Sequence, residues 1–257
     1  MDNNRRTFLK IAGISAALGL GGGIPLTLQA SEPGNDPYVK GGQGLTAKRW
    51  GMVIDTRKFK TEKDFQTVIN ACHSYHNIPE IQGDEEIKWI WTDEFEHVFP
   101  SKNNPYLAER FEHKEFLLLC NQCDDPPCVR VCPTKATFQR PDGIVMMDYH
   151  RCIGCRYCMA GCPYGSRSFN FSDPAPHVQD KNPDYPTRVR GVVEKCNFCA
   201  ERLELGKMPA CVEASNGAII FGDLSDPDSE IRHVLRDNYT IRRKVELGTN
   251  PCVFYIV

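Results

Sequence analysis

The apolar positions of this chain gather in short segments. Ile87, Trp89 and Trp91 alternate with polar residues, which is the period of a strand with one buried face. We expect this stretch to form a hairpin that covers the first module, and the alternative is an insertion that touches a partner. The apolar, β-branched and aromatic run around Cys252 predicts a buried strand. These signals favour an α+β fold with short strands, short helices and many loops.

Residues 1–30 differ in character from the rest of the chain. Arg5 and Arg6 precede a mildly apolar run that stops at Leu20, before three glycines and a proline. This run is too short to span a bilayer. It predicts a twin-arginine export signal, either cleaved after Ala30 or retained as a membrane tether. We therefore expect the protein in the periplasm or on the outer face of the cytoplasmic membrane.

Charge and composition exclude several function classes. Lys and Arg number 31 and Asp and Glu number 33, which gives a net charge of -2. This balance offers no footprint for nucleic acid and no polybasic patch for a membrane surface. The sequence also has no nucleophile elbow, phosphate-binding loop or dinucleotide fingerprint. We predict electron transfer without catalytic residues, with substrate chemistry left to partner proteins.

Thirteen cysteines carry the candidate chemistry. Two runs of four have the spacings C-x2-C-x4-C-x3-C-P and C-x2-C-x2-C-x3-C-P, and the second is the spacing of bacterial ferredoxins. Exported proteins often use cysteines in disulfides, and C-x2-C pairs also bind zinc. A non-redox, disulfide- or zinc-stabilised exported protein is therefore the alternative. The two runs consist of Cys120, Cys123, Cys128 and Cys132, and of Cys152, Cys155, Cys158 and Cys162.

The two runs form an internal repeat, because each continues into a short predicted strand and a turn. In two-cluster ferredoxins the fourth cysteine of each run ligates the cluster of the other run. We therefore expect two [4Fe-4S] clusters with crossed ligands. The predicted ligand sets are Cys120, Cys123, Cys128 and Cys162 for one cluster, and Cys152, Cys155, Cys158 and Cys132 for the other.

A further trio of cysteines stands in the segment KCNFCAERLELGKMPAC and consists of Cys196, Cys199 and Cys211. If the flanks of the chain repeat the crossed arrangement, the fourth ligand comes from near the N-terminus. Cys72 is the sole thiol there, and it completes a third predicted [4Fe-4S] set. We expect the adjacent His73 and His76 to pack or form hydrogen bonds, because cysteine dominates iron–sulfur ligation.

These motifs carry a resemblance to a known family. The stretches CNQCDDPPCVRVCPTKATF, DGIVMMDYHRCIGCRYCMAGCPYGSRSFNF and VVEKCNFCAERLELGKMPACVEA resemble the exported four-cluster ferredoxin-like subunits of membrane oxidoreductases. This is the family of the beta subunits of dimethyl sulfoxide and polysulfide reductases. The resemblance covers most of the chain after the signal. It implies two pseudo-symmetric ferredoxin-like modules, one central and one from the two flanks, around a row of clusters.

Within this family the chain resembles the exported DsrO-type subunits of the Dsr membrane complexes of sulfur-metabolising prokaryotes. That resemblance implies an integral membrane subunit that interacts with quinone, and a multihaem cytochrome c or another redox subunit. It also implies peripheral membrane association through a partner. Iron–sulfur subunits of polysulfide, thiosulfate and tetrathionate reductases share the motifs and pass electrons to a molybdopterin subunit, so this alternative stays open.

The chain departs from the family at one cluster. Three cysteines are expected before Cys72, but Phe59 to Ala71 contain none, and Ser215 stands where the ligand that completes them is expected. All four ligands of one cluster are thus missing together, while those of its neighbour remain. We therefore expect three clusters. The missing one should be terminal, because an internal gap would be too wide for tunnelling.

The domain organisation follows from these motifs. Ser229 is a suitable N-cap for a short helix through Leu235. The predicted segments are a signal peptide (1–30), a linker (31–47), a first flank of the outer module with an insertion (48–114), the central two-cluster module (115–172), a second flank (173–223) and a closing segment (224–257).

Overall fold

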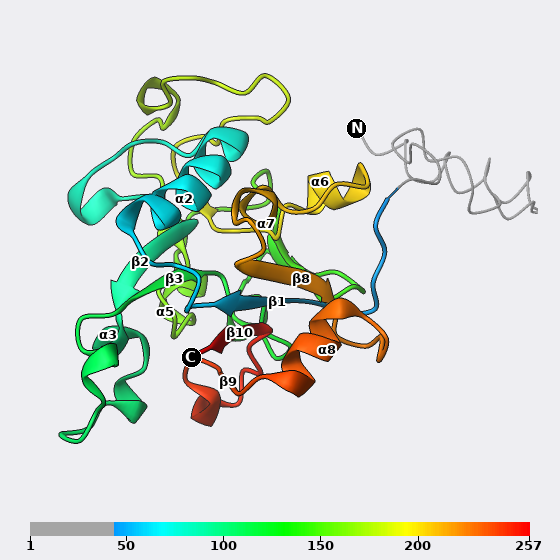
Figure 1. Ribbon diagram of the computed structural model, residues 1–257. Coiled ribbons are helices and arrows are strands. Elements are labelled where there is room, and N and C mark those ends of the chain that lie inside the picture. Colours follow the sequence, from blue (N-terminus) through cyan, green and yellow to red (C-terminus); the bar gives the residue numbers. More distant parts are fainter. Residues whose placement is uncertain (1–43) are drawn as a thin grey trace, which may run out of the picture. The chain divides into compact units, whose positions relative to one another are not determined.

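A four-stranded sheet joins the beginning and the end of the fold. The computed structural model describes residues 44–257, so the predicted signal and the linker up to residue 43 lie outside the described residues. Strand β1 (Trp50–Asp55) pairs antiparallel with β8 and parallel with β10, in the order β8-β1-β10-β9 (Figure 1). All of β1 is buried. Its partners are β8 (Ile219–Asp223), β9 (Thr240–Ile241) and β10 (Val253–Ile256).

Helix α2 (Glu62–His76) is the longest helix of residues 44–257, and it packs against α7 (Ala210–Ala214). Acidic Asp64 in the first turn accepts the N–H of the residue before the helix at 2.8 Å, which favours a helix start there. The buried positions of α2 recur at helical spacing and form one apolar face. Packing of this face brings Cys72 of α2 to the side of Cys211 on α7.

The alternating stretch forms a hairpin, but its strand begins later than its first apolar residues. Strand β2 (Ile90–Glu94) pairs antiparallel with β3 (Glu115–Leu119). Ile87 and Trp89 are buried before this strand, because the Trp89 indole N–H donates to the Glu194 carboxylate at 2.8 Å and ties the segment to the core. The hairpin connection contains α3 (Phe95–Val98) and the 3-10 turns Pro100–Lys102 and Glu109–Phe111.

The central part of the chain is built twice from the same pieces. Each cysteine run contains a one-turn helix, followed by a turn and a short strand, and Cys132 and Cys162 come just after these helices. Helices α4 and α5 pack together, and the strands pair antiparallel as β4 with β5 and β6 with β7. The elements are α4 (Pro127–Arg130), β4 (Thr137–Gln139), β5 (Val145–Met147), α5 (Tyr157–Ala160), β6 (Ser168–Phe169) and β7 (Val193–Glu194).

The remaining helices are short and peripheral. Helix α8 (Glu230–Asp237) begins after Ser229, as predicted, and packs on β1 and β8. The Ser229 hydroxyl does not cap this helix, because it donates instead to the carbonyls of Asp223 and Asp226 at 2.7 and 2.8 Å. Helix α6 (Ala200–Glu204) follows the third cysteine pair. Short strands and short helices confirm the predicted α+β class. Within residues 44–257, none of the helices has the length and apolar character needed to span a bilayer.

Candidate iron–sulfur sites

The first C-x2-C loop of each cysteine motif shares one backbone feature. The residue before the second cysteine has a positive φ angle in each loop, with values of 45° at Gln122, 69° at Gly154 and 55° at Phe198. This region is open to glycine and strained for most other residues. A turn of this kind gathers backbone N–H groups on one side, as anion-binding loops do. Three separate segments therefore adopt the same local geometry, and two of them do so at the expense of strain.

The first predicted ligand set lines one small, mainly apolar hollow, which we call the Cys120 site. Cys120 and Cys123 lie after β3, Cys128 lies in α4, and Cys162 follows α5. The structure thus brings together thiols from both runs, as crossed ligation requires. Burial, with a further contribution from Cys120, raises the pKa of Cys123 to about 12. Ionisation of such thiols needs a cationic partner, which an iron centre would supply.

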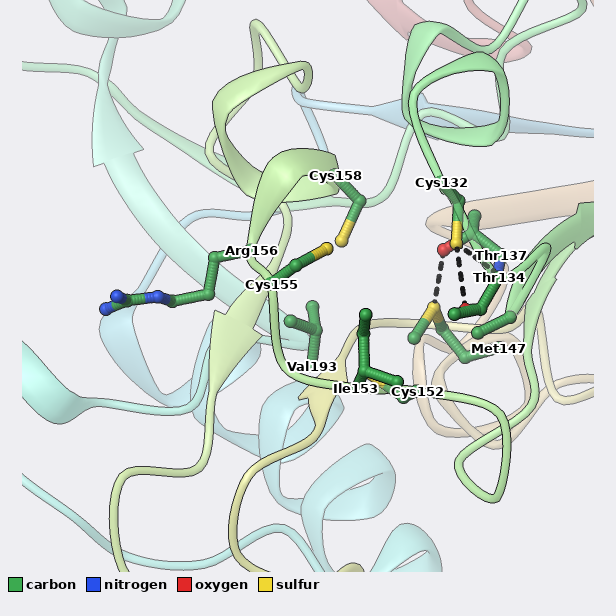
Figure 2. Close-up of a pocket in the computed structure, with 11 residues that line it drawn as sticks. Cys132, Thr134, Thr137, Met147, Cys152, Ile153, Cys155, Arg156, Cys158 and Val193 are labelled. Atoms are coloured by element: carbon green, nitrogen blue, oxygen red, sulfur yellow. Dashed lines mark hydrogen bonds between the residues drawn. The ribbon is translucent and has the colours of Figure 1, made fainter.

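The second predicted set lines another hollow, the Cys152 site (Figure 2). Cys132 comes from the first run, and Cys152, Cys155 and Cys158 come from the second. Burial disfavours the Cys132 thiolate, but the Thr137 N–H donates to its Sγ at 3.4 Å, and the pKa of Cys132 is lowered. Cys155 is exposed. The Cys152 site therefore opens to the surface.

The third predicted set is fully buried, and we call it the Cys72 site. Cys72 lies on α2, Cys211 on α7, Cys196 after β7 and Cys199 before α6, and all four are buried. Burial is the main cause that raises the pKa of Cys72 well above its usual range, and the nearby Cys196 and Cys211 add to it. Burial, with further contributions from Cys211 and Cys72, likewise raises the pKa of Cys199. Thiols from both flanks of the chain are therefore close neighbours.

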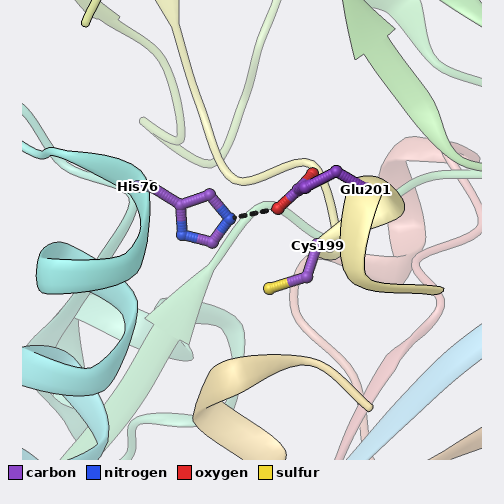
Figure 3. Close-up of side chains that lie close together, drawn as sticks. All are labelled: His76, Cys199 and Glu201. Carbon is purple, nitrogen blue, oxygen red and sulfur yellow. Dashed lines mark hydrogen bonds and ion pairs between the residues drawn. The ribbon is translucent and has the colours of Figure 1, made fainter. Parts of the chain in front are cut away.

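His76 and Glu201 lie beside this site (Figure 3). The ring Nε2 of His76 is 2.8 Å from the Glu201 carboxylate, and Nδ1 is 2.9 Å from the Cys72 carbonyl oxygen. His76, Cys199 and Glu201 place ligand atoms within 4.8 Å of one another, as a single-metal site would need. Such a site would withdraw Cys199 from the predicted cluster. Because both ring nitrogens of His76 already face partners, its geometry favours a supporting role.

The Cys120 site is close to both of the other sites, which favours the predicted row with the Cys120 site in its middle. Burial raises the pKa of Cys196, and the next largest contribution comes from Cys120. Burial also raises the pKa of Cys158, and Cys128 adds to this effect. Thiolate charges influence one another in this way at short range. The Cys120 site therefore adjoins the Cys72 site on one side and the Cys152 site on the other.

Side chains of other kinds occupy the region where a fourth site would be expected. The Ser215 hydroxyl donates to the Val212 carbonyl at 2.7 Å and accepts the Ile219 N–H at 3.0 Å. Phe59 is buried and stacks on Phe65, with ring centroids 4.8 Å apart. The adjoining hollow of about 470 Å³ is lined by Phe59 and Ser215 among others, and no cysteine lines it. The missing ligands are thus replaced by an aromatic stack and a satisfied hydroxyl.

Sequence reasoning missed the polar residues that lie between the sites. Gln122 donates through Nε2 to the Cys196 carbonyl at 2.9 Å, and its Oε1 accepts the Val145 N–H at 2.8 Å. It therefore ties the Cys120 loop to the Cys72 site. Buried Arg167 and Lys195 occupy comparable places. These polar residues stand beside or between the cysteine motifs, and that position was the one sign of their role. The sequence alone does not distinguish them from polar residues on the surface.

The donor chemistry at the three sites fits [4Fe-4S] clusters. Each site offers four thiols, and thiolate is the ligand that these clusters take. All thirteen cysteines lie within the described residues, and each is free of a disulfide. Backbone N–H groups near the sulfurs, such as that of Thr137, would stabilise a bound anion. The residues present therefore fit such clusters, and their ligation stays a prediction.

Comparison with known proteins supports [4Fe-4S] clusters in this chain. Two profiles of 4Fe-4S dicluster domains match residues 112–174 and 144–214. The chain is 39% identical to the Hdr-like menaquinol oxidoreductase iron-sulfur subunit 1 of Archaeoglobus fulgidus, over 98% of this chain and 97% of that protein. It is 38% identical to the menaquinone reductase iron-sulfur cluster-binding subunit of Nitratidesulfovibrio vulgaris, over 81% of this chain and 88% of that subunit.

A third relative is a tetrathionate reductase subunit of Salmonella typhimurium, at 35% identity over 100% of this chain and 89% of that protein. Two of these three similarities cover nearly all of the present chain. They extend far beyond the cysteine runs and include both flanks. The chain therefore belongs to the family of iron–sulfur electron-transfer subunits of oxidoreductase complexes, of the dimethyl sulfoxide and polysulfide reductase beta type.

Proposed function

We propose that this chain holds three [4Fe-4S] clusters and relays electrons between a membrane quinone-interacting subunit and a second redox subunit. The observation that carries the proposal is the gathering of four cysteines at each of three adjoining sites. When bound, each cluster would accept and release one electron. The residues of the chain hold the clusters, limit the access of water and set the affinity of each cluster for an electron.

The missing cluster is proposed to be terminal. The hollow beside Ser215 is lined by residues from the connection between β1 and α2, from α2 and from the end of α7. None of the residues that line the Cys120 or Cys152 site contributes to it. Ser215 is instead close in the chain to Cys211 of the Cys72 site. Because tunnelling weakens steeply with distance, loss of an end cluster would leave the other three connected.

The opposite end of the row is proposed to exchange electrons with a partner. At the Cys152 site, Ile153 is 67% exposed and Tyr157 is 63% exposed, beside the exposed Cys155. Clustered apolar surface of this kind is typical of protein interaction sites. A subunit docked here would cover the open site and exclude water from it. Replacing Ile153 with Glu should slow electron exchange at this end without loss of iron.

The relatives support a quinone-linked complex. Two of them are named as a menaquinol oxidoreductase subunit and a menaquinone reductase subunit. We propose a Dsr-type complex of sulfur metabolism, in which this DsrO-type chain contacts an integral membrane subunit and a multihaem cytochrome c. Membrane association would be peripheral, through that partner, and the net charge of -2 argues against nucleic acid as a partner.

A second candidate function is that of a beta subunit in a molybdopterin polysulfide, thiosulfate or tetrathionate reductase. The similarity to the tetrathionate reductase subunit of Salmonella typhimurium over the whole chain favours it. The two candidates differ in the protein that copurifies. A haem-containing protein would support the Dsr-type complex, and a molybdopterin protein would support the reductase.

Export by the twin-arginine route is also proposed, to the periplasm or the outer face of the cytoplasmic membrane. The motif around Arg5 and Arg6 supports it. Replacing both arginines with Lys keeps the charge but removes the motif. The wild-type chain should be found outside the cytoplasm, and the double variant should remain inside. Equal distribution of the two chains would contradict this route.

Quinol-driven reduction tests the relay directly. The complex, purified without oxygen, should bleach in its visible absorption when a menaquinol analogue is added. The Cys155→Ser variant should bleach less, because it removes one of the three proposed clusters. Cys252→Ser should leave the bleaching intact, because Cys252 is outside all three predicted ligand sets. An iron-free, colourless protein would instead support the disulfide- or zinc-stabilised alternative.

A further inference from the structure

Arg167 lies between the Cys120 and Cys152 sites. Its side chain lines the hollow of the Cys120 site and is only 5% exposed. Its Nη1 donates to the Thr137 hydroxyl at 3.2 Å and to the Met147 sulfur at 3.3 Å. Thr137 and Met147 line the Cys152 site. One buried guanidinium therefore faces both sites.

This arginine has no counter-charge among the described residues. None of their carboxylates pairs with Arg167, and its buried Nη2 has no hydrogen-bond partner within residues 44–257. Arg188 provides the contrast, because it is equally buried but meets the Glu194 carboxylate at 2.6 Å and the Asn77 carbonyl at 2.7 Å. A buried charge without a partner is strongly unfavourable. Arg167 is thus placed to face an anion that none of the described carboxylates provides.

The thiols around Arg167 are suited to supply that anion. Cys128 lines the same hollow as Arg167. Cys158 lines the hollow of Thr137 and Met147, the two residues to which Arg167 donates. These two cysteines belong to different sites. Because a guanidinium keeps its charge in proteins, Arg167 is cationic whichever way its neighbours titrate.

Lys195 lies between the Cys120 site and the Cys72 site. It is 1% exposed, and its Nζ donates to the Cys196 carbonyl at 2.8 Å and to the Val145 carbonyl. Cys196 belongs to the Cys72 site, and Val145 lines the Cys120 site. No ion pair of Lys195 with a carboxylate occurs in the part of the chain that the structure describes. The middle site is therefore flanked by one buried cation on each side.

We propose that Arg167 and Lys195 raise the reduction potentials of the clusters that they separate, and that the middle Cys120 site is raised most. A cluster held by four thiolates is anionic, and reduction adds one more negative charge. A fixed cation in a water-poor interior favours that reduced state. The free Nη2 of Arg167 adds a donor for a cluster or cysteine sulfur. This inference rests on the proposed three-cluster function.

The test is a redox titration of the purified complex, followed by electron paramagnetic resonance. Signals are assigned to the sites with the Cys155→Ser and Cys199→Ser variants. Arg167→Gln should lower the potentials of the Cys120 and Cys152 sites and leave the Cys72 site unchanged. Lys195→Met should lower those of the Cys120 and Cys72 sites and leave the Cys152 site unchanged. We expect at least a tenfold change in the reduction equilibrium, which is about 59 mV for one electron.

Two further variants separate charge from structure. Arg151→Gln removes the same charge from an exposed residue beside Cys152, paired with Asp148 at 3.1 Å. Screening by water and salt should limit its effect to less than about twofold. Arg167→Lys keeps the charge and should retain most of the wild-type potentials. A Lys variant that fails to load iron would overturn the proposal in favour of a purely structural role.

Iron content shows whether the proposed function itself fails or only the inference about Arg167 and Lys195. If the wild-type chain lacks three clusters, the proposed function fails and the inference fails with it. If Arg167→Gln and Lys195→Met carry the wild-type iron content but their potentials are unchanged, or if all three sites shift equally, the inference alone is overturned. The inference is supported if each variant shifts the reduction potentials of the two sites on either side of the replaced residue and not that of the third site.

Discussion

In the proposed row of clusters, the Ser215 region and the Cys152 site lie at opposite ends. At the Cys152 site, four cysteines line an apolar hollow that opens to the surface at Cys155. In the Ser215 region, the hydroxyl bonds within its own segment, and Phe59 stacks on Phe65. The first end keeps space and donors for a cluster. The second holds ordinary side-chain packing and an open hollow that no cysteine lines.

This difference favours the proposal that the ligands of the fourth cofactor site are absent together. A single unfilled thiol position would leave buried polar groups without partners, which is costly. Ser215 avoids this because both its donor and its acceptor functions are satisfied. The buried ring of Phe59 stabilises this region by packing, where a cluster would do so through metal–thiolate bonds. The following variants test this contrast, beginning with the largest expected effect.

Removal of one ligand from a retained site should remove a whole cluster. In Cys199→Ser, the Cys72 site loses a thiolate, and the iron content should fall by about four atoms per chain. Anaerobic iron and acid-labile sulfide analysis measures this loss. Cys252→Ser is the matched control, since the Cys252 sulfur accepts N–H groups of Arg49 at 3.1 and 3.3 Å and lies outside the predicted sets. Equal iron losses in both variants would contradict the ligand assignment.

Removal of the aromatic stack should destabilise the protein without affecting iron. Phe59→Ala deletes a buried ring against Phe65 and should lower the free energy of unfolding by about 3 kcal/mol. Chemical denaturation of the holoprotein, with iron analysis of the folded fraction, checks both parts. Tyr106→Ala is the matched control, because Tyr106 is 93% exposed. Loss of iron on Phe59→Ala would show that this region still holds a cluster.

The turn at Gly154 should tolerate no larger residue. Its φ is 69°, and an added Cβ would lie 2.5 Å from the Gly191 carbonyl oxygen. Gly154→Ala should therefore lower stability by about 1–3 kcal/mol and weaken cluster retention at the Cys152 site. Gly248→Ala tests the backbone effect alone, since Gly248 has φ of 67° but no atom near its added Cβ. The same retention in both variants would rule out the steric explanation.

The smallest effect is expected from restoring a thiol at Ser215. Ser215→Cys should leave the iron content unchanged, because the other three ligands of that cluster are absent from Phe59 to Ala71. Its stability should change by about 1 kcal/mol through the altered hydrogen bonds. Iron analysis beside the wild-type chain checks this. A gain of about four irons would disprove the crossed-ligand argument.

Much of the site could be predicted because cysteine spacing is local information. The central runs indicated which thiols should meet, and the hollows of the Cys120 and Cys152 sites are lined by those same sets. Ligation itself stays a prediction. The α+β class also followed from short apolar segments. The beginning of the hairpin strand was set too early, because the tertiary contact of Trp89 with Glu194 removes Trp89 from the ladder.

The features that sequence did not predict depend on tertiary proximity. Arg167 and Lys195 are ordinary charged residues in the sequence, and their burial between sites arises only when the two halves of the fold close together. The left-handed conformations of Gln122 and Phe198 were also unexpected, since neither residue type favours that region. Their repetition before the second cysteine becomes visible only when the three loops are compared in space.

Iron and acid-labile sulfide per chain, measured on anaerobically purified wild-type protein, test the central claim most directly. Three four-iron clusters predict about 12 irons and about 12 sulfides per chain. About 8 irons would mean that the Cys72 site does not hold a cluster. About 16 irons would contradict the account, because the Ser215 region would then hold the fourth cluster that its aromatic stack is argued to replace.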